Sequence, residues 1–255
     1  ARKVNAAKAI PLRYVGSGWS LKGGGNNRGT NAVDLQQART ADTQVASGNY
    51  TTIGGGNNNT ASVQYATIGG GRGNTASAGY ATVCGGRSNT ASGPYATVLG
   101  GRYAIADKSG QLAHAGFYFT AIGDAQHSII PVGATTTDAT PTVLDLERWG
   151  TPGEGADLTI ADDTVWNFRA EIVAMTADAA KYAAYTVTGL IKRANGTVAV
   201  AGVTTTVINE SDAGWDATAE ADDTNKALSI KVTGAAGTTI RWVAAVYTTE
   251  CSFGS

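Results

Sequence analysis

The chain has 255 residues, a formal net charge of −1 at pH 7 and only 15% charged residues. This length allows one large domain or two modest ones. The abundance of glycine, alanine and threonine favours close-packed strands and turns over helices. No apolar run approaches the ~18 residues of a membrane-spanning helix, and the first 15 residues lack the apolar core of a secretory signal. We therefore expect synthesis in a cytoplasm and no membrane insertion.

Charge is unevenly spread along the chain. Residues 1–33 carry six basic residues and no acid, whereas residues 138–224 carry fifteen acids against five bases. The pattern fits two differently solvated surfaces, or a basic end docked onto a larger body with an acidic end held away from it.

The first stretch, residues 1–45, is basic at its start and ends in AVDLQQARTADTQV, which we expect to form a short helix or an extended arm. A 15-residue repeat follows in residues 46–105. Its copies are ASGNYTTIGGGNNNT, ASVQYATIGGGRGNT, ASAGYATVCGGRSNT and ASGPYATVLGGRYAI. A fixed short period predicts a solenoid whose units cannot bury a core alone.

Within each copy, alternation places the alanine and the following Ile or Val on one face of a short strand. The paired glycines then permit the positive φ values of a tight turn. Stacked rungs, ~4.8 Å apart, would align the tyrosines in an aromatic ladder and Asn74 and Asn89 in an amide ladder. The expected scaffold positions are Tyr50, Tyr65, Tyr80, Tyr95, Ile53, Ile68, Val83 and Val98.

The core of such a solenoid is thin, because alanine and one Ile or Val per rung bury little apolar area. Four rungs in a single chain should be marginally stable. We therefore expect several chains to associate side by side.

Residues 106–134 are interpreted as a transition or neck, and residues 132–142 as a linker. Residues 135–255 contain about eight strand-like runs without helical segments. The clearest has Trp166, Phe168, Ala170, Ile172 and Ala174 at a period of two. Evenly spaced strands and turns predict an antiparallel β-sandwich or jelly roll. The fold class is thus all-β.

Few residues point to catalysis or to metal chemistry. The triple glycines lack the Gly-Lys-Ser/Thr ending of a phosphate loop, and the repeats lack the aspartates of calcium-binding rolls. His114 and His127 have no nucleophile motif around them. The acidic pairs at 162–163 and 222–223 are interpreted as solvated turn carboxylates. We expect no enzyme activity, no metal and no cofactor.

The repeats resemble those of bacteriophage tail-fibre proteins and, more distantly, the heads of trimeric autotransporter adhesins. GQLAHAGFYFTAIGDAQ resembles the segment that closes such arrays. The motifs TVWNFRAEIVA, TGLIKR and TIRWVAAVYTTE are similar to a domain that often ends such fibres. This resemblance implies a homotrimeric, surface-exposed component of a virion, with an N-terminal attachment region, a short β-roll shaft and a globular β-domain.

The leading hypothesis is a non-enzymatic phage spike whose three tips turn weak contacts, for instance with host surface polysaccharide, into avidity. Its partners would be two further copies and tail, baseplate or capsid proteins, without nucleic acid. Candidate receptor-binding residues are Trp149, Asp162, Asp163 and Trp215, and candidate attachment residues are Arg2, Lys3, Lys8 and Arg13. The alternative is a capsid decoration protein that strengthens the shell. A polysaccharide-degrading tailspike would need a carboxylate pair in a groove, which the sequence does not place.

Overall fold

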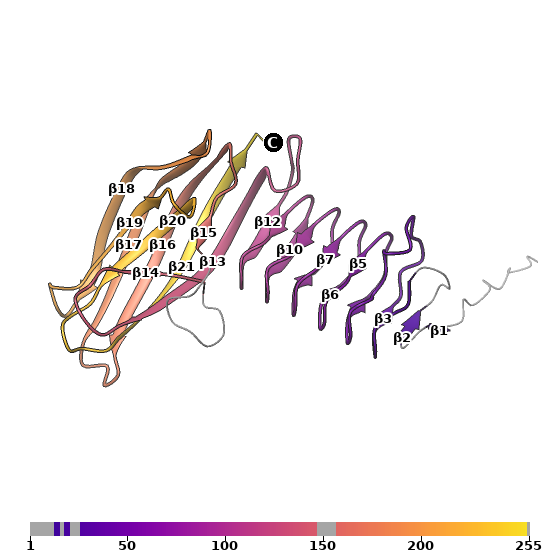
Figure 1. The fold of residues 1–255 in the computed structure, drawn as a ribbon, viewed down its shortest axis with the longest axis horizontal. Helices are drawn as coiled ribbons and strands as arrows, with labels where there is room; N and C mark the ends of the chain where they lie inside the picture. Colours follow the sequence, from indigo (N-terminus) through magenta and orange to yellow (C-terminus); the bar gives the residue numbers. More distant parts are fainter. Residues whose placement is uncertain (1–12, 16–17, 21–25, 147–156, 254–255) are drawn as a thin grey trace, which may run out of the picture.

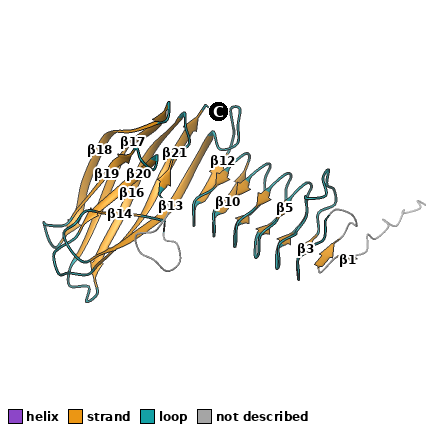
Figure 2. Ribbon diagram, viewed as in Figure 1, coloured by secondary structure: helices purple, strands orange, loops and turns teal. Residues whose placement is uncertain are grey.

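The computed structural model describes residues 13–15, 18–20, 26–146 and 157–253, and these residues form strands, turns and loops without a helix. The chain is therefore all-β over this part, as expected. Figures 1 and 2 show a row of rungs that leads from β1 to a group of longer strands.

The rungs form a β-solenoid of six parallel strands, and a hairpin pairs with its first strand. The hairpin consists of β1 (Arg13–Val15) and β2 (Gly18–Ser20). The six strands are β3 (Val33–Asp34), β4 (Thr52–Ile53), β6 (Thr67–Ile68), β8 (Thr82–Val83), β10 (Thr97–Gly101) and β12 (Leu112–Ala115). A second parallel sheet consists of β5 (Thr60–Ala61), β7 (Thr75–Ala76), β9 (Thr90–Ala91) and β11 (Ile105–Ala106). One rung lies on each side of the four that the repeats predicted.

The solenoid core includes the residues that the alternation predicted, together with the alanines of the second sheet, which it did not predict. Ala66 and Ile68 are fully buried, and their equivalents in the other rungs join them in one cluster made mainly of alanine. The threonine between them is only half-buried. The core is as thin as expected, because each rung adds one branched apolar side chain.

Residues 32–45 form the first rung of the solenoid, so the expectation of a helix or an arm is wrong. Val33 pairs in parallel with Thr52, and Ala38 bridges to Asn57. The stretch lacks the repeat motif, but its backbone follows the rung above it, because parallel pairing to a regular neighbour requires an extended chain.

The solenoid joins the C-terminal strands through one continuous sheet. β12 pairs antiparallel with β13 (Ala125–Thr136), and β13 pairs along its whole length with β21 (Ile240–Ser252). The sheet continues through β16 (Thr164–Thr176), β17 (Tyr182–Ala194) and β18 (Thr197–Glu210). The expected linker at residues 132–142 is therefore partly wrong, because its first five residues belong to β13.

A smaller antiparallel sheet faces these long strands. It consists of β14 (Thr142–Leu144), β15 (Leu158–Thr159), β19 (Asp216–Asp222) and β20 (Ala227–Thr233). One apolar cluster contains buried residues of both sheets, among them Phe168 and Trp242 from the large sheet and Ile230 from the small one. The five residues of β16 that alternate at a period of two in the sequence are all buried.

Candidate functional site

The tyrosines of the repeats form an exposed ladder on the solenoid. The ring centroids of successive residues from Tyr50 to Tyr95 lie 5.2, 4.8 and 5.0 Å apart in stacked geometry, which confirms the expected ladder. The tyrosines lie in the turn that precedes each strand, with φ between 58° and 63°. Such a backbone is rare for a bulky residue. Its recurrence in every repeat indicates that the stack and the backbone pairing hold it in place.

An asparagine column runs inside the opposite turn of each rung. Asn74 donates from Nδ2 to the carbonyls of Gly70 and Gly86 at 2.9 and 3.0 Å, and its Oδ1 accepts from the backbone N–H of Asn89 at 2.9 Å. Asn59 and Asn89 repeat these contacts one rung to either side. The amide ladder is thus confirmed, and it satisfies backbone groups that the tight turn would leave unpaired.

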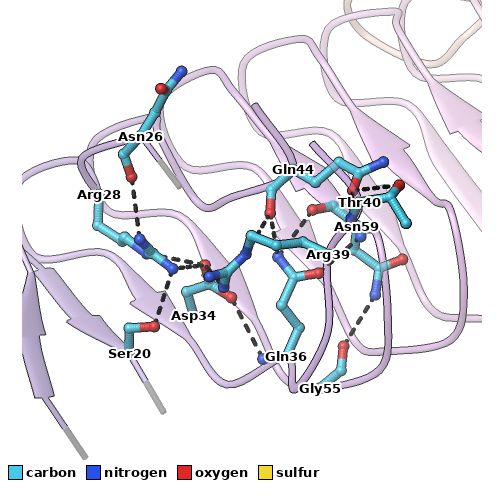
Figure 3. A network of polar contacts seen from close by, with 10 residues as sticks. All are labelled: Ser20, Asn26, Arg28, Asp34, Gln36, Arg39, Thr40, Gln44, Gly55 and Asn59. Atoms are coloured by element: carbon cyan, nitrogen blue, oxygen red, sulfur yellow. Dashed lines mark hydrogen bonds and ion pairs between the residues drawn. The ribbon is translucent and has the colours of Figure 1, made fainter. Parts of the chain in front are cut away.

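Polar side chains close the first rung of the solenoid (Figure 3). Asp34 occupies the register position of Ile53, and Arg28 and Arg39 contact its carboxylate at 3.0 and 3.2 Å. Gln36 replaces an asparagine of the column, since its Oε1 accepts from the N–H of Asn59 at 2.8 Å. Because Arg28 and Asp34 are both buried, we interpret this network as a structural cap.

A second buried network lies where the solenoid meets the long strands. Gln126 accepts a hydrogen bond from the backbone N–H of Ile105 and donates one to its carbonyl. It also donates to the carboxylate of Glu250 at 3.0 Å. Thr248 donates to the other oxygen of Glu250 at 2.6 Å. Burial raises the pKa of Glu250, although hydrogen bonds from Ser128, Thr248 and Gln126 oppose the shift.

Three arginines follow one another along one edge of the solenoid. Arg72, Arg87 and Arg102, here called the arginine column, are joined through consecutive parallel bridges and are exposed. No acidic residue lies between Asp42 and Asp107. Within the described residues, Arg72 and Arg87 have neither an ion pair nor a side-chain hydrogen bond. Sequence reasoning missed this column, although the arginine recurs at the same position of three repeats.

Aromatic residues gather at the C-terminal end of the arginine column. The guanidinium carbon of Arg102 lies 4.4 Å from the ring centroid of Tyr118, and the rings of Tyr118 and Tyr103 are 4.0 Å apart. A hydrogen bond from Arg102, with a second from Tyr103, lowers the pKa of Tyr118. Phe117 and Phe119 beside it are 59% and 62% exposed. Arg102, Tyr103 and Tyr118 contact one another, and Phe117 and Phe119 flank Tyr118 in the chain with their rings edge to face; we call these five side chains the aromatic cluster.

Asp124 holds the loop that carries these aromatic residues. Its buried carboxylate accepts from the backbone N–H groups of Phe119, Thr120 and Ala121. Burial alone would raise the pKa of Asp124, but these backbone donors bring it below its usual value. The carboxylate therefore stays charged and fixes the loop.

The C-terminal candidates for receptor binding do not form one site. Trp215 is 2% exposed and packs 5.6 Å from Trp242, so it is a core residue and its assignment as a receptor contact is wrong. Asp162 accepts from the N–H of Gly196 at 3.1 Å and thereby supports the β17–β18 turn. Asp163 is exposed in the adjacent turn. Trp149 lies outside the described residues.

The attachment candidates lie almost entirely outside the described part of the chain. Arg2, Lys3 and Lys8 are not described, and Arg13 begins β1. Within the described ranges, we find neither a group of three or more metal-ligating side chains nor a helix able to cross a membrane. His114 and His127 pair across β12 and β13 with ring centroids 5.1 Å apart.

Among solved structures, the chain is similar to tailspike proteins of Acinetobacter phages. The tailspike gp49 of Acinetobacter baumannii phage Fri1 is 11% identical, with a TM-score of 0.26 over 80% of this chain and 41% of its own. The tailspike of phage AM24 is 13% identical, with a TM-score of 0.28 over 92% and 52%. That of phage vB_ApiP_P1 is 10% identical, with a TM-score of 0.21 over 92% and 53%. The chain thus spans about half the length of these proteins. No protein-family model and no curated protein matches the sequence.

One of these proteins contradicts the expectation that the chain is not an enzyme. The Fri1 tailspike is described as a capsular polysaccharide depolymerase. The expectation that the chain has no enzyme activity is therefore not retained.

Proposed function

We propose that the protein is a short phage spike that projects from the virion and contacts the host surface. The observation that carries this proposal is the joining of the solenoid to the C-terminal strands by a single sheet from β3 to β18. A continuous sheet makes a stiff stalk, because hydrogen bonds cross the junction without a flexible linker. The motif order of the sequence, with repeats followed by a closing segment and a terminal domain, supports the same function.

The spike is proposed to be a homotrimer. The alanine-rich solenoid core buries little area, and the outer face of the long strands leaves Val173 and Val243 exposed although they are neighbours in the sheet. Exposed apolar patches of this kind mark contact surfaces. In a trimer this face would be covered by the other chains.

The C-terminal domain, proposed as an antiparallel β-sandwich, would present its loops to the host. Asp163 and Trp149 remain candidates for that contact, and the basic residues Arg2 and Lys3 for attachment to the particle. Replacing Trp149 and Asp163 with alanine is expected to abolish binding to host cells without changing the number of chains in the assembly. Thr239→Ala, in the turn at the end of the domain away from Asp163, serves as the control. Unchanged adsorption of the double variant would rule out these two side chains.

The position of the protein on the virion tests the proposed function directly. Cryo-EM or a gold-labelled antibody should locate it at the tail or the baseplate. Density spread over the capsid would instead support the decoration alternative, in which particles lacking the protein lose heat resistance but still adsorb normally.

A further inference from the structure

The arginine column carries positive charge that the solenoid does not neutralise. Its rungs are ~4.8 Å apart, so the exposed guanidinium groups of Arg72 and Arg87 repel each other. The nearest acids in sequence are Asp42 and Asp107, and Asp107 is already paired with Lys108. A repeated unpaired charge on a regular scaffold indicates that its counter-charge is supplied by another molecule.

A second copy of the solenoid cannot supply that charge. Residues 43–106 contain no acid in any copy, so parallel chains in register would place like-charged or neutral rungs beside the column. The column therefore fits an outward position on the spike better than a contact between chains, because like charges across an interface are unfavourable.

The aromatic cluster shows what kind of anion the column would fit. Arginine binds carboxylates and phosphates through two parallel hydrogen bonds. Exposed aromatic rings bind the C–H faces of sugar rings, and Phe117 and Phe119, on either side of Tyr118 in the chain, are both largely exposed. Asp124 fixes the loop that carries them, so the faces are held in place before any ligand arrives.

We propose that the arginine column and the aromatic cluster together bind an anionic polysaccharide along the solenoid. This inference rests on the proposed function, since it names the ligand class of a spike that contacts the host surface. A nucleic acid fits less well, because it carries a charge at every nucleotide. Its strand would extend toward a C-terminal region with fifteen acids against five bases in residues 138–224.

Binding of the full chain to carboxylated polysaccharides tests the proposal. Polygalacturonate, alginate and hyaluronate are immobilised, with neutral dextran as the reference, and binding is measured by biolayer interferometry. We expect the R72Q/R87Q variant to bind at least about tenfold more weakly than the unaltered chain, because two charge-assisted hydrogen-bonding groups are lost. The F117A/F119A variant should also weaken binding while leaving the charge unchanged.

The K181Q/K226Q variant is the matched control, because it removes two positive charges, with side chains 48% and 32% exposed, from turns of the C-terminal domain rather than from the outer face of the long strands. It should bind within about twofold of the unaltered chain, since long-range attraction is screened by salt. If R72Q/R87Q and the control variant lose polymer binding equally, net charge alone explains the effect, and the proposal is overturned. Failure of the unaltered chain to bind any of the three polymers would overturn it too, as would tighter binding to double-stranded DNA.

The number of chains per particle and host adsorption separate this inference from the proposed function. If R72Q/R87Q changes the oligomeric state in sedimentation, the column lies between chains and the inference fails. If particles carrying R72Q/R87Q adsorb normally and the polymers bind as before, the spike function stands and the arginine site does not. If the protein binds the polymers through the column but is absent from the virion, the proposed function fails on its own.

Discussion

Asn59, Asn74 and Asn89 each close one rung onto the next through a buried side-chain amide. At the scale of single residues, this column shows why the repeat tolerates so little change at one position and so much at others. Position nine of the repeat holds glycine, cysteine or leucine, whereas position 14 keeps asparagine in three copies. Position 14 changes least because the side-chain amide of its asparagine forms hydrogen bonds with several backbone groups.

Asn74→Ala is expected to destabilise the protein by about 3 kcal/mol, because it leaves the N–H of Asn89 and the carbonyls of Gly70 and Gly86 without their partner. Urea unfolding at fixed protein concentration measures the change. Ser62→Ala, an exposed position of the same solenoid, should change stability by less than about 0.5 kcal/mol. Equal stability of the two variants would contradict the structural role of the column.

Neighbouring glycines in one turn provide a second comparison. Gly86 has a φ of 90°, and a Cβ there would lie 2.1 Å from the carbonyl oxygen of Gly101, whereas a Cβ on Gly85 would meet nothing within 4 Å. We expect Gly86→Ala to cost at least about 2 kcal/mol and Gly85→Ala to be neutral or stabilising by about 0.5 kcal/mol. Thermal unfolding of both variants measures this, and a harmless Gly86→Ala would exclude the close approach of successive rungs.

At the scale of elements, the junction between β12 and β13 decides how the solenoid and the long strands are joined. Here the sheet changes from parallel to antiparallel pairing. The side chain of Gln126 makes the two hydrogen bonds to the backbone of Ile105 that a further rung would otherwise make. The polar end of the solenoid is thus covered by a side chain of β13, and the carboxylate of Glu250 is buried as a result.

Glu250 is expected to make stability fall as pH rises. Its folded-state pKa is raised by burial, so the unfolded chain releases this proton first, and the folded state loses relative stability between the two pKa values. Glu250→Gln should therefore stabilise the protein near neutral pH but not below about pH 4. Urea unfolding across this range measures the difference. Glu220→Gln, at an exposed position of β19, is the control, and a pH-independent difference for Glu250→Gln would contradict the raised pKa.

At the scale of the whole molecule, the six rungs form a shaft of about 25 Å at ~4.8 Å per rung. Its small core and the exposed valine pair on the outer face of the long strands both argue for association. Val243 lies on a central strand of that face, between β13 and β16, and is 58% exposed. A central strand is the position where a sheet is ordinarily most covered.

Val243→Glu should dissociate the proposed trimer, because a buried unpaired carboxylate would have to be desolvated at the interface. Sedimentation equilibrium is expected to detect a single-chain species at concentrations where the unaltered protein is a trimer. Thr218→Glu adds the same charge on the exposed face of the small sheet and should leave the assembly intact. If Val243→Glu remained trimeric, the outer face of the long strands would not be the contact surface.

The sequence alone determined the solenoid, the inward and outward positions of its repeated strand, its two ladders and the alternating strand β16. These features are local, because the period of the repeat and the alternation within a strand depend only on nearby residues. The sequence did not predict the first rung, because residues 32–45 lack the repeat motif. Their backbone is placed by its pairing with the next rung.

The tertiary structure alone decided which residues meet across long separations. The pairing of Ala125 with Cys251 places β21 beside β13, which buries Glu250 at the junction. Trp215 became a core residue in the same way, by facing strands distant in sequence. The Arg102–Tyr118 contact forms because the loop after β12 folds back onto the last repeat. Such contacts depend on how distant segments pair, and a single sequence carries no local signal for that pairing.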